Sequence, residues 1–255
     1  VDPDAAGVTV DRGRLDALLV ERAHAAGVEV LQPARVLEQV ETAGGWRLAL
    51  AHDGRVLKRA ADVLADATGR GGRSVAEGPR TIAAFAYWRP VGRMPAPCIE
   101  ATDTAWVWGV PLPDGLYNTL VVCRPETLRA SPGTLETRVA TLLARSRLLP
   151  DLSDALRDGP LGAADATARR APDPIGPRFV RVGDAALSLD PISSSGVQKA
   201  IQGALAAAVT ANTLLRKPDR RATAMDFYAD HLRRTALRHR RWSAGHYAAA
   251  EATRP

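Results

Sequence analysis

Cysteines, clustered metal ligands and long apolar runs are scarce in this sequence, and each scarcity excludes a class of protein. The 255 residues include two cysteines, Cys98 and Cys123, far from any C-x-x-C spacing, which indicates reduced structural thiols and no disulfide framework or zinc site. The histidines His231, His239 and His246 are spaced too widely for a helical metal pair, so we predict no metal site and a polar helix face. No segment approaches the roughly 18 consecutive apolar residues of a membrane span.

A secretory signal and a nucleic-acid-binding patch are also missing. Residues 1–7 include two aspartates and no basic, apolar or cleavage region, which favours a cytoplasmic protein. The net charge of +6 comes from basic residues scattered along the chain, and only the tail, at Arg233–Arg234 and 238–241, is densely basic. We interpret this patch as a solvated helix face and predict no nucleic-acid partner; an acidic protein partner is the alternative.

The length of the chain predicts two closely packed units, and its periodicity predicts an α/β chain. A strand at 8–10, a helix that ends at Gly27 and a strand at 28–31 would form a strand–helix–strand unit. An antiparallel meander then leads to a buried strand and a glycine-rich turn; these segments are expected at 36–40, 46–51, from 56 onward, and at 61–72. The first part of the chain therefore combines a helix with a hairpin sheet.

A second sheet and a helical end are expected in the rest of the chain. The predicted strands of this sheet are 81–88, 99–101, 106–110 and 116–123. Helical periodicity returns at 134–149, and a strand at 179–182 precedes a long helix at 197–215 that Pro218 stops. A basic, mostly helical tail follows.

The run from Phe179 to Val197 has the strongest chemical signature. An apolar strand enters Gly183, which allows close approach to the backbone, and Asp184 places a carboxylate where sugar-alcohol hydroxyls can donate to it. The turn at Asp190-Pro191 then leads through a serine-rich loop and Gly196 into the long helix, whose free N–H groups and dipole favour negative charge. The simpler alternative is a turn at Gly183 and serines that merely cap the helix.

This run resembles the Gly-Asp flavin motif of glutathione-reductase-type flavoproteins, in the form seen in flavin-dependent halogenases and aromatic hydroxylases. The segment 10–19 is similar to the one before that family's adenine-contacting strand, and Ala67-Thr68-Gly69 to its central Ala-Thr-Gly motif. The sequence Trp106-Val-Trp108-Gly-Val-Pro111 resembles the Trp-x-Trp-x-x-Pro signature of halogenases, and strand alternation puts both indoles on one face. Two core tryptophans remain the alternative for this pair.

The resemblance implies a glutathione-reductase-type FAD-binding fold, an antiparallel substrate-domain sheet and a helical C-terminal tail. The implied domains are FAD-binding at 1–75 and 175–217, substrate-binding at 76–174 and the tail at 218–255. The implied FAD-contacting residues are Arg12, Val36, Gly69, Gly183, Asp184, Pro191, Ser195, Gly196 and Val197. The candidate substrate contacts are Trp106, Trp108, Ser193 and Ser194. No catalytic residue is identified.

Two departures from the family pattern matter. No G-x-G-x-x-G occurs, and the chain begins at what resembles the family's middle, without the strand–helix–strand unit for the FAD pyrophosphate or the segment of the catalytic lysine; we interpret it as a fragment or a chain cut from a longer protein. Ser193 stands where tryptophan halogenases tend to have a glutamate. The fold is therefore expected to be incomplete, and the substrate need not be free tryptophan.

The resemblance implies an FAD-dependent monooxygenase or halogenase-like enzyme that uses a peroxyflavin. Its substrate would be an electron-rich aromatic group, indole, tryptophan or phenol, free or within a peptide or protein partner, and its electron source a flavin reductase or NAD(P)H. One alternative is a non-catalytic or incomplete fragment that serves as a partner-binding half. A lesser one is a flavin-dependent prenyl reductase on the same scaffold.

Overall fold

The computed structural model describes residues 9–89 and 96–252, which divide into two compact units. The first unit comprises Val1–Val30, Arg80–Ala166 and Ala250–Pro255, as far as they are described, and the second comprises Leu31–Pro79 and Thr167–Ala249. Each unit has its own sheets and its own buried cluster. No helix within the described ranges is both long and apolar enough to cross a membrane.

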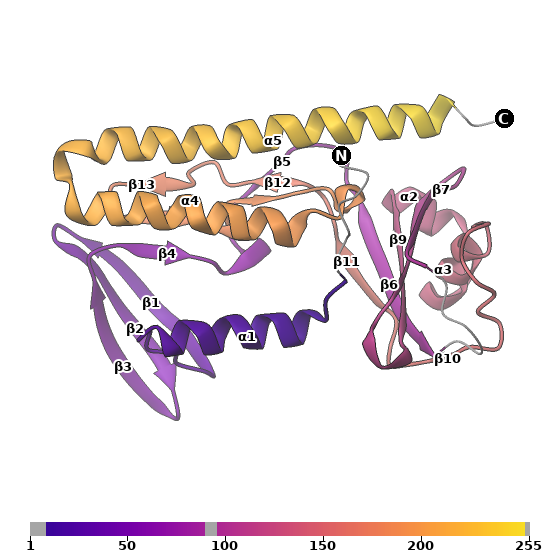
Figure 1. The fold of residues 1–255 in the computed structure, drawn as a ribbon, viewed down its shortest axis with the longest axis horizontal. Coiled ribbons are helices and arrows are strands. Elements are labelled where there is room, and N and C mark those ends of the chain that lie inside the picture. Colours follow the sequence, from indigo (N-terminus) through magenta and orange to yellow (C-terminus); the bar gives the residue numbers. More distant parts are fainter. Residues whose placement is uncertain (1–8, 90–95, 253–255) are drawn as a thin grey trace. The chain divides into compact units, whose positions relative to one another are not determined.

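An antiparallel sheet forms the centre of the first unit, with strand order β10-β6-β9-β8-β7 and β11 also paired to β6 (Figure 1). Its strands are β6 (Ile82–Arg89), β7 (Cys98–Ala101), β8 (Trp106–Pro111), β9 (Tyr117–Cys123), β10 (Leu156–Arg157) and β11 (Gly162–Asp165). A 3₁₀ turn, η2 (Pro113–Gly115), joins β8 to β9. The strands predicted at 81–123 are therefore confirmed. Both cysteines, Cys98 on β7 and Cys123 on β9, are free thiols.

Helices α2 (Pro125–Ala130) and α3 (Leu135–Leu143) cover one face of this sheet. The buried cluster contains Val107 and Val121 from the sheet together with Val139 and Leu142 from α3. The predicted helix at 134–149 is too long, because α3 ends at Leu143. Beyond it, the carboxylate of Glu100 on β7 accepts hydrogen bonds from the N–H groups of residues 147 and 148, at 2.9 and 3.1 Å, and draws the chain out of helical geometry.

Helix α1 (Arg12–Ala25) also belongs to the first unit. Asp11 caps its N-terminus, and the Asp11 side chain accepts a hydrogen bond from the Arg14 N–H at 2.8 Å. The strand predicted at 28–31 is wrong, because these residues form no strand. Of the strand predicted at 8–10, residue 8 lies outside the described residues and 9–10 are not extended into a strand. Neither 28–31 nor 9–10 pairs with a neighbouring strand among the described residues, and a strand needs such a neighbour.

The second unit begins with a three-stranded hairpin sheet, which confirms the predicted antiparallel meander. Its strands are β1 (Ala34–Thr42), β2 (Gly45–His52) and β3 (Arg55–Ala61). Trp46 at the start of β2 donates from Nε1 to the Arg178 carbonyl at 2.7 Å and packs against the Phe179 ring. These contacts tie the hairpin sheet to the strand that leads to Gly183.

The second unit continues with short strands and two long helices. β4 (Leu64–Asp66) pairs in parallel with β14 (Phe179–Arg181), which also pairs with β13 (Ile175–Gly176). A second small sheet joins β5 (Val75–Ala76), β12 (Arg169–Arg170) and β15 (Leu187–Ser188).

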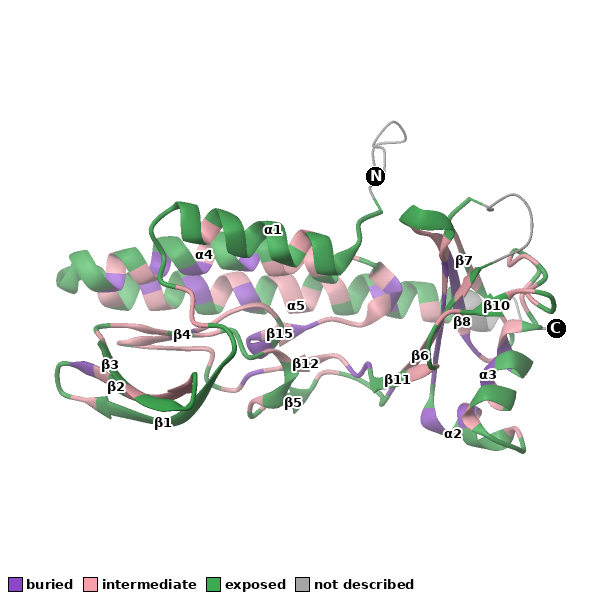
Figure 2. Ribbon diagram, turned by 90° about the horizontal axis from the view of Figure 1, so that it is seen from below, coloured by how far each residue is buried: buried purple, intermediate pink, exposed green. Residues whose placement is uncertain are grey.

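Helix α4 (Gly196–Arg216), the short turn η5 (Pro218–Arg220) and α5 (Arg221–Ala252) confirm the predicted long helix and helical tail. The two helices lie side by side, and buried and exposed residues alternate along both (Figures 1 and 2). Tyr228 of α5 is fully buried and donates from its hydroxyl to the Arg181 carbonyl at 2.6 Å. This bond fixes α5 against β14, two residues before Gly183.

Candidate functional site

Two glycine turns meet at the carboxyl ends of the parallel strands β4 and β14. After β4, Asp66 Oδ1 accepts hydrogen bonds from Thr68 N and Oγ1, at 3.0 and 2.6 Å, and the chain enters η1 (Gly69–Gly71) with Gly69 at φ +76°. After β14, it enters η3 (Gly183–Ala185) with Gly183 at φ +58°, and η1 contacts η3. The carboxyl ends of parallel strands are where open α/β sheets bind ligands, so these turns form the base of the site.

Asp184 presents its carboxylate from this base to solvent. The residue is exposed, and within the part of the chain that the structure describes it has no hydrogen-bond or ion-pair partner. A Cβ built on the neighbouring Gly183 would meet only the methyl group of Ala200, at 3.9 Å, so the backbone is open to close approach. An ionised carboxylate with free lone pairs next to an accessible backbone can accept two hydroxyl donors.

The N-terminus of α4 is uncapped. Ser195 at the N-cap position makes no side-chain bond to the helix; its Oγ pairs instead with Ser193 Oγ at 2.7 Å. The first helical hydrogen bond runs from Lys199 N to the Ser195 carbonyl at 2.9 Å, so the N–H groups of residues 196–198 have no partner among the described residues. Ser195 therefore does not cap the helix through its side chain, and the helix end remains able to bind an anionic edge.

The segment 190–195, which we call the serine loop, includes the turn η4 (Pro191–Ser193) and is fastened to α5. Asp190 donates its N–H to His239 Nε2 and accepts at Oδ2 from the Tyr247 hydroxyl, both at 3.0 Å, while Oδ1 accepts from Ile192 N at 3.0 Å. His239, predicted to lie on a polar helix face, is instead half-buried against this loop. Sequence reasoning missed both α5 residues, because no local pattern joins them to Asp190.

In the first unit, Trp106 and Trp108 lie on one face of β8, as alternation predicted, with ring centroids 6.4 Å apart. The intervening Val107 points to the opposite face, into the cluster under α2 and α3. Gly109, the next residue of the signature, has no room for a side chain, because its Cβ would lie 1.9 Å from Tyr117 Oη. The signature thus combines an indole pair with a glycine that the neighbouring strand requires.

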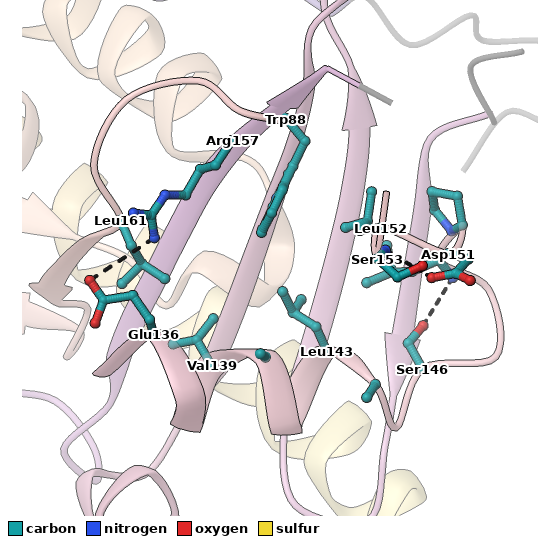
Figure 3. Close-up of a pocket in the computed structure, with 14 residues that line it drawn as sticks. Trp88, Glu136, Val139, Leu143, Ser146, Asp151, Leu152, Ser153, Arg157 and Leu161 are labelled. Carbon is teal, nitrogen blue, oxygen red and sulfur yellow. Dashed lines mark hydrogen bonds and ion pairs between the residues drawn. The ribbon is translucent and has the colours of Figure 1, made fainter. Parts of the chain in front are cut away.

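A cavity of about 620 Å³ lies on the α3 side of the same sheet (Figure 3). Trp88 from β6 forms one wall, and Val139 and Leu143 from α3 face it. The ion pair between Arg157 and Glu136, at 4.0 Å, stands at one end. Because Trp88 is on the face of the sheet that α3 covers, this cavity does not include the Trp106–Trp108 pair.

The residues of the second unit fit a flavin. Asp184 offers acceptors for ribityl hydroxyls, and the free N–H groups that begin at Gly196 and Val197 suit the carbonyl-bearing edge of an isoalloxazine ring. Gly69 lies beside this base, whereas Val36 is exposed on β1 of the hairpin sheet. Arg12 lies on α1 in the first unit, in an exposed ion pair with Asp16 at 3.1 Å. The structure therefore brings together the ring and ribityl side of the predicted site.

Comparison with known proteins places the chain in a family. Residues 6–254 match the model of the tryptophan halogenase family. The flavin-dependent halogenase armH5 of Armillaria mellea is 30% identical over 247 residues, covering 82% of this chain and 47% of armH5. Sulochrin halogenase gedL of Aspergillus terreus is 33% identical over 183 residues, covering 61% of this chain and 33% of gedL. The chain spans about half the length of armH5 and a third of gedL.

Comparison with solved structures supports the same family and fold. The peptidyl tryptophan dihydroxylase QhpG, described as essential for tryptophylquinone cofactor biogenesis, is 32% identical with a TM-score of 0.74 and covers 91% of this chain and 54% of its own. The flavin-dependent halogenase CmlS has a TM-score of 0.86 at 22% identity and covers 98% of this chain and 48% of its own, which speaks for the fold alone. The predicted α/β fold of the glutathione-reductase type and the predicted FAD dependence of the family are confirmed. This chain belongs to the tryptophan halogenase family of flavin-dependent proteins.

Proposed function

We propose that this chain forms the flavin-ring side of an FAD-dependent monooxygenase or halogenase that acts on an electron-rich aromatic group. The observation that carries the proposal is that the Asp184 carboxylate, which has no partner among the described residues, lies with the uncapped N-terminus of α4 at one end of the parallel strands. When bound, FAD would supply a reduced ring that activates dioxygen for oxygen transfer or halide oxidation. A flavin reductase or NAD(P)H is the proposed electron source, and the cytoplasm the proposed location.

The side chains divide the work of binding between two ends of the ring system. Asp184 would accept hydrogen bonds from the ribityl chain, while the N–H groups of Gly196 and Val197 and the dipole of the 21-residue α4 would favour negative charge at the pyrimidine edge. Pro191 and Ser195 would shape the loop between these ends. Val36 and Gly69 would lie near the adenosine half, and Arg12 is a further proposed FAD contact.

Replacing Asp184 by alanine should weaken FAD binding by about 2 kcal/mol, roughly 30-fold in Kd, because hydrogen bonds to a charged group contribute about 1.5–3 kcal/mol. The measurement is a fluorescence titration of FAD against the protein expressed from its whole gene. Asp173→Ala is the matched control, since Asp173 is an exposed carboxylate of the same unit without a partner among the described residues. Equal affinities for the two variants would remove Asp184 from the site.

The proposed substrate is an indole or phenol, free or carried by a peptide, with Trp106, Trp108, Ser193 and Ser194 as candidate contacts. Both halogenation and hydroxylation have support, since gedL is named a sulochrin halogenase and QhpG a peptidyl tryptophan dihydroxylase. Mass spectrometry of the product with and without bromide decides between them. A mass increase that requires bromide indicates a halogenase, whereas an increase of one or two oxygen atoms without halide indicates a hydroxylase.

A non-catalytic, partner-binding role is the second candidate. It is favoured by the apolar stripe on α4, where Ile201, Leu205 and Val209 are 46%, 66% and 63% exposed. Side chains four residues apart share one helix face, so these three form a continuous apolar surface. Reduced FAD that is consumed with oxygen to yield a modified aromatic product would exclude this role.

A further inference from the structure

The serine loop depends on α5 for its position. The side chain of Asp190 is tied at both oxygens, and its N–H is tied to His239. Other hydrogen bonds within the loop are short-range, among them Ser194 N to the Pro191 carbonyl at 2.9 Å and the contacts between Ser193 and Ser195. The loop ends at Ser195, where the uncapped helix begins. A shift of Asp190 would therefore be carried to the N–H groups that face the proposed flavin edge.

We propose that His239 and Tyr247 are positioning residues that hold the serine loop in its flavin-binding form, and that protonation of His239 releases it, so that flavin affinity falls on acidification. This inference rests on the proposed flavin site. It assigns to the C-terminal helix a part in cofactor binding that its basic sequence does not suggest.

The direction of the hydrogen bond gives His239 this role. A backbone N–H can only donate, so Nε2 of His239 must accept, and the ring must be neutral with its proton on Nδ1. A protonated ring would present an N–H to the N–H of Asp190, two donors would face each other, and the anchor would be lost. Tyr247 would still contact the loop through Asp190 Oδ2.

The surroundings of His239 oppose its protonation. Burial lowers the pKa of His239 most, the Asp190 carboxylate raises it and the Lys199 ammonium on α4 lowers it, with a net shift below the usual value. On α5 itself, Arg238 and Arg240 flank the ring in sequence, and Arg240 lies 3.9 Å from Glu77. The neutral ring is thus the form that the folded protein favours.

The pH window follows from this direction. When the loop is released or unfolded, His239 gains its proton at the ordinary histidine pKa of about 6.5. When the loop is anchored, His239 gains its proton only at lower pH. The anchored form therefore binds fewer protons, its stability is complete above about pH 6.5, and this stability is lost as the pH falls through the lowered pKa of the folded state.

The test is an FAD titration of the protein expressed from its whole gene at pH 7.5 and pH 5.5. We expect the affinity of the wild type for FAD to be about tenfold lower at pH 5.5 than at pH 7.5, because pH 5.5 lies about one unit below the ordinary histidine pKa. His239→Gln keeps a neutral acceptor and should bind as the wild type does at pH 7.5 with little loss at pH 5.5, whereas His239→Ala should be weakened at both values. Tyr247→Phe should weaken binding about tenfold at both values and keep the pH dependence, since it removes one hydrogen bond to the Asp190 carboxylate. His24→Gln, an exposed histidine on α1, is the control and should behave as the wild type.

A second readout needs no flavin. Nitrogen-15 spectra of labelled histidine should show His239 with its proton on Nδ1 at pH 7.5 and a titration midpoint below about 6.5, the ordinary pKa of a histidine side chain. A pH dependence of FAD affinity that is the same in His239→Gln and the wild type, or a His239 midpoint at or above about 6.5, overturns the inference. Absence of FAD binding by the wild type at pH 7.5 refutes the proposed function instead, and the histidine spectra then still decide whether His239 is the neutral anchor.

Discussion

Tyr228→Ala should lower the free energy of unfolding of the second unit by about 3–5 kcal/mol, the usual cost of truncating a buried aromatic side chain. Tyr228 is 0% exposed and lies in the cluster that joins β14, α4 and α5. The substitution leaves a cavity there and deprives the Arg181 carbonyl of its donor. Since domains have about 5–15 kcal/mol of stability in total, a large fraction of this unit's margin would be lost.

The measurement is urea unfolding followed by circular dichroism. Phe227→Ala is a matched control, because Phe227 is the neighbouring residue, has a similar ring and is 51% exposed; it should cost less than about 0.5 kcal/mol. Tyr228→Phe should cost about 1–3 kcal/mol, since the cavity is avoided but the carbonyl stays unsatisfied. Burial raises the pKa of Tyr228 to about 12, so the hydroxyl remains a donor at neutral pH. Similar losses for Tyr228→Ala and Phe227→Ala would contradict this account of the core.

Gly109→Ala should destabilise the first unit by about 3 kcal/mol, at the upper end of the usual cost of overpacking a core. The new Cβ would lie 1.9 Å from Tyr117 Oη, 2.7 Å from Tyr117 Cζ and 2.5 Å from Leu149 Cδ2. Tyr117 is 0% exposed, so its ring cannot swing into solvent to relieve the overlap. The strand that carries Trp106 and Trp108 would have to move, and the indole pair with it.

Thermal unfolding monitored by tryptophan fluorescence measures both the loss and the change around the indoles. Gly44→Ala is the control, because a Cβ at Gly44 meets nothing within 4 Å and its φ is not positive; it should be nearly neutral. Adding Tyr117→Phe to Gly109→Ala should recover part of the stability, since the contact with the oxygen disappears while the ring carbon stays. An unfolding temperature for Gly109→Ala equal to that of Gly44→Ala would show that β8 tolerates a side chain at this position.

The variants at Tyr228 and Gly109 also test the functions of the two units separately. Tyr228 supports the strand before Gly183 and Asp184, so its loss should impair flavin binding through unfolding of the second unit. Gly109 supports the indole pair, so its substitution should leave FAD affinity largely unchanged and alter substrate turnover. The division of function between a flavin-binding and a substrate-binding part remains a proposal that these measurements address.

Local sequence determined the elements whose signals repeat within a few residues. The strands β6 to β9, the hairpin sheet, α4 and α5 follow from alternation and from helical spacing, because those patterns reflect which side chains a single element buries. The Gly183-Asp184 turn and the family could also be predicted from the sequence. The turn needs only a glycine, here at φ +58°, and an exposed carboxylate, and both lie in one short segment.

Only the tertiary structure decided the rest, because partners far apart in sequence leave no local pattern. Glu100 on β7 draws the chain beyond α3 out of helical geometry, and residues 28–31 join none of the sheets of the described residues. Ser195 looks like a helix cap, yet its hydroxyl pairs with Ser193 and leaves the helix end free. His239 contacts Asp190 across 49 residues, so a histidine that periodicity assigns to a polar surface becomes an anchor of the candidate flavin site.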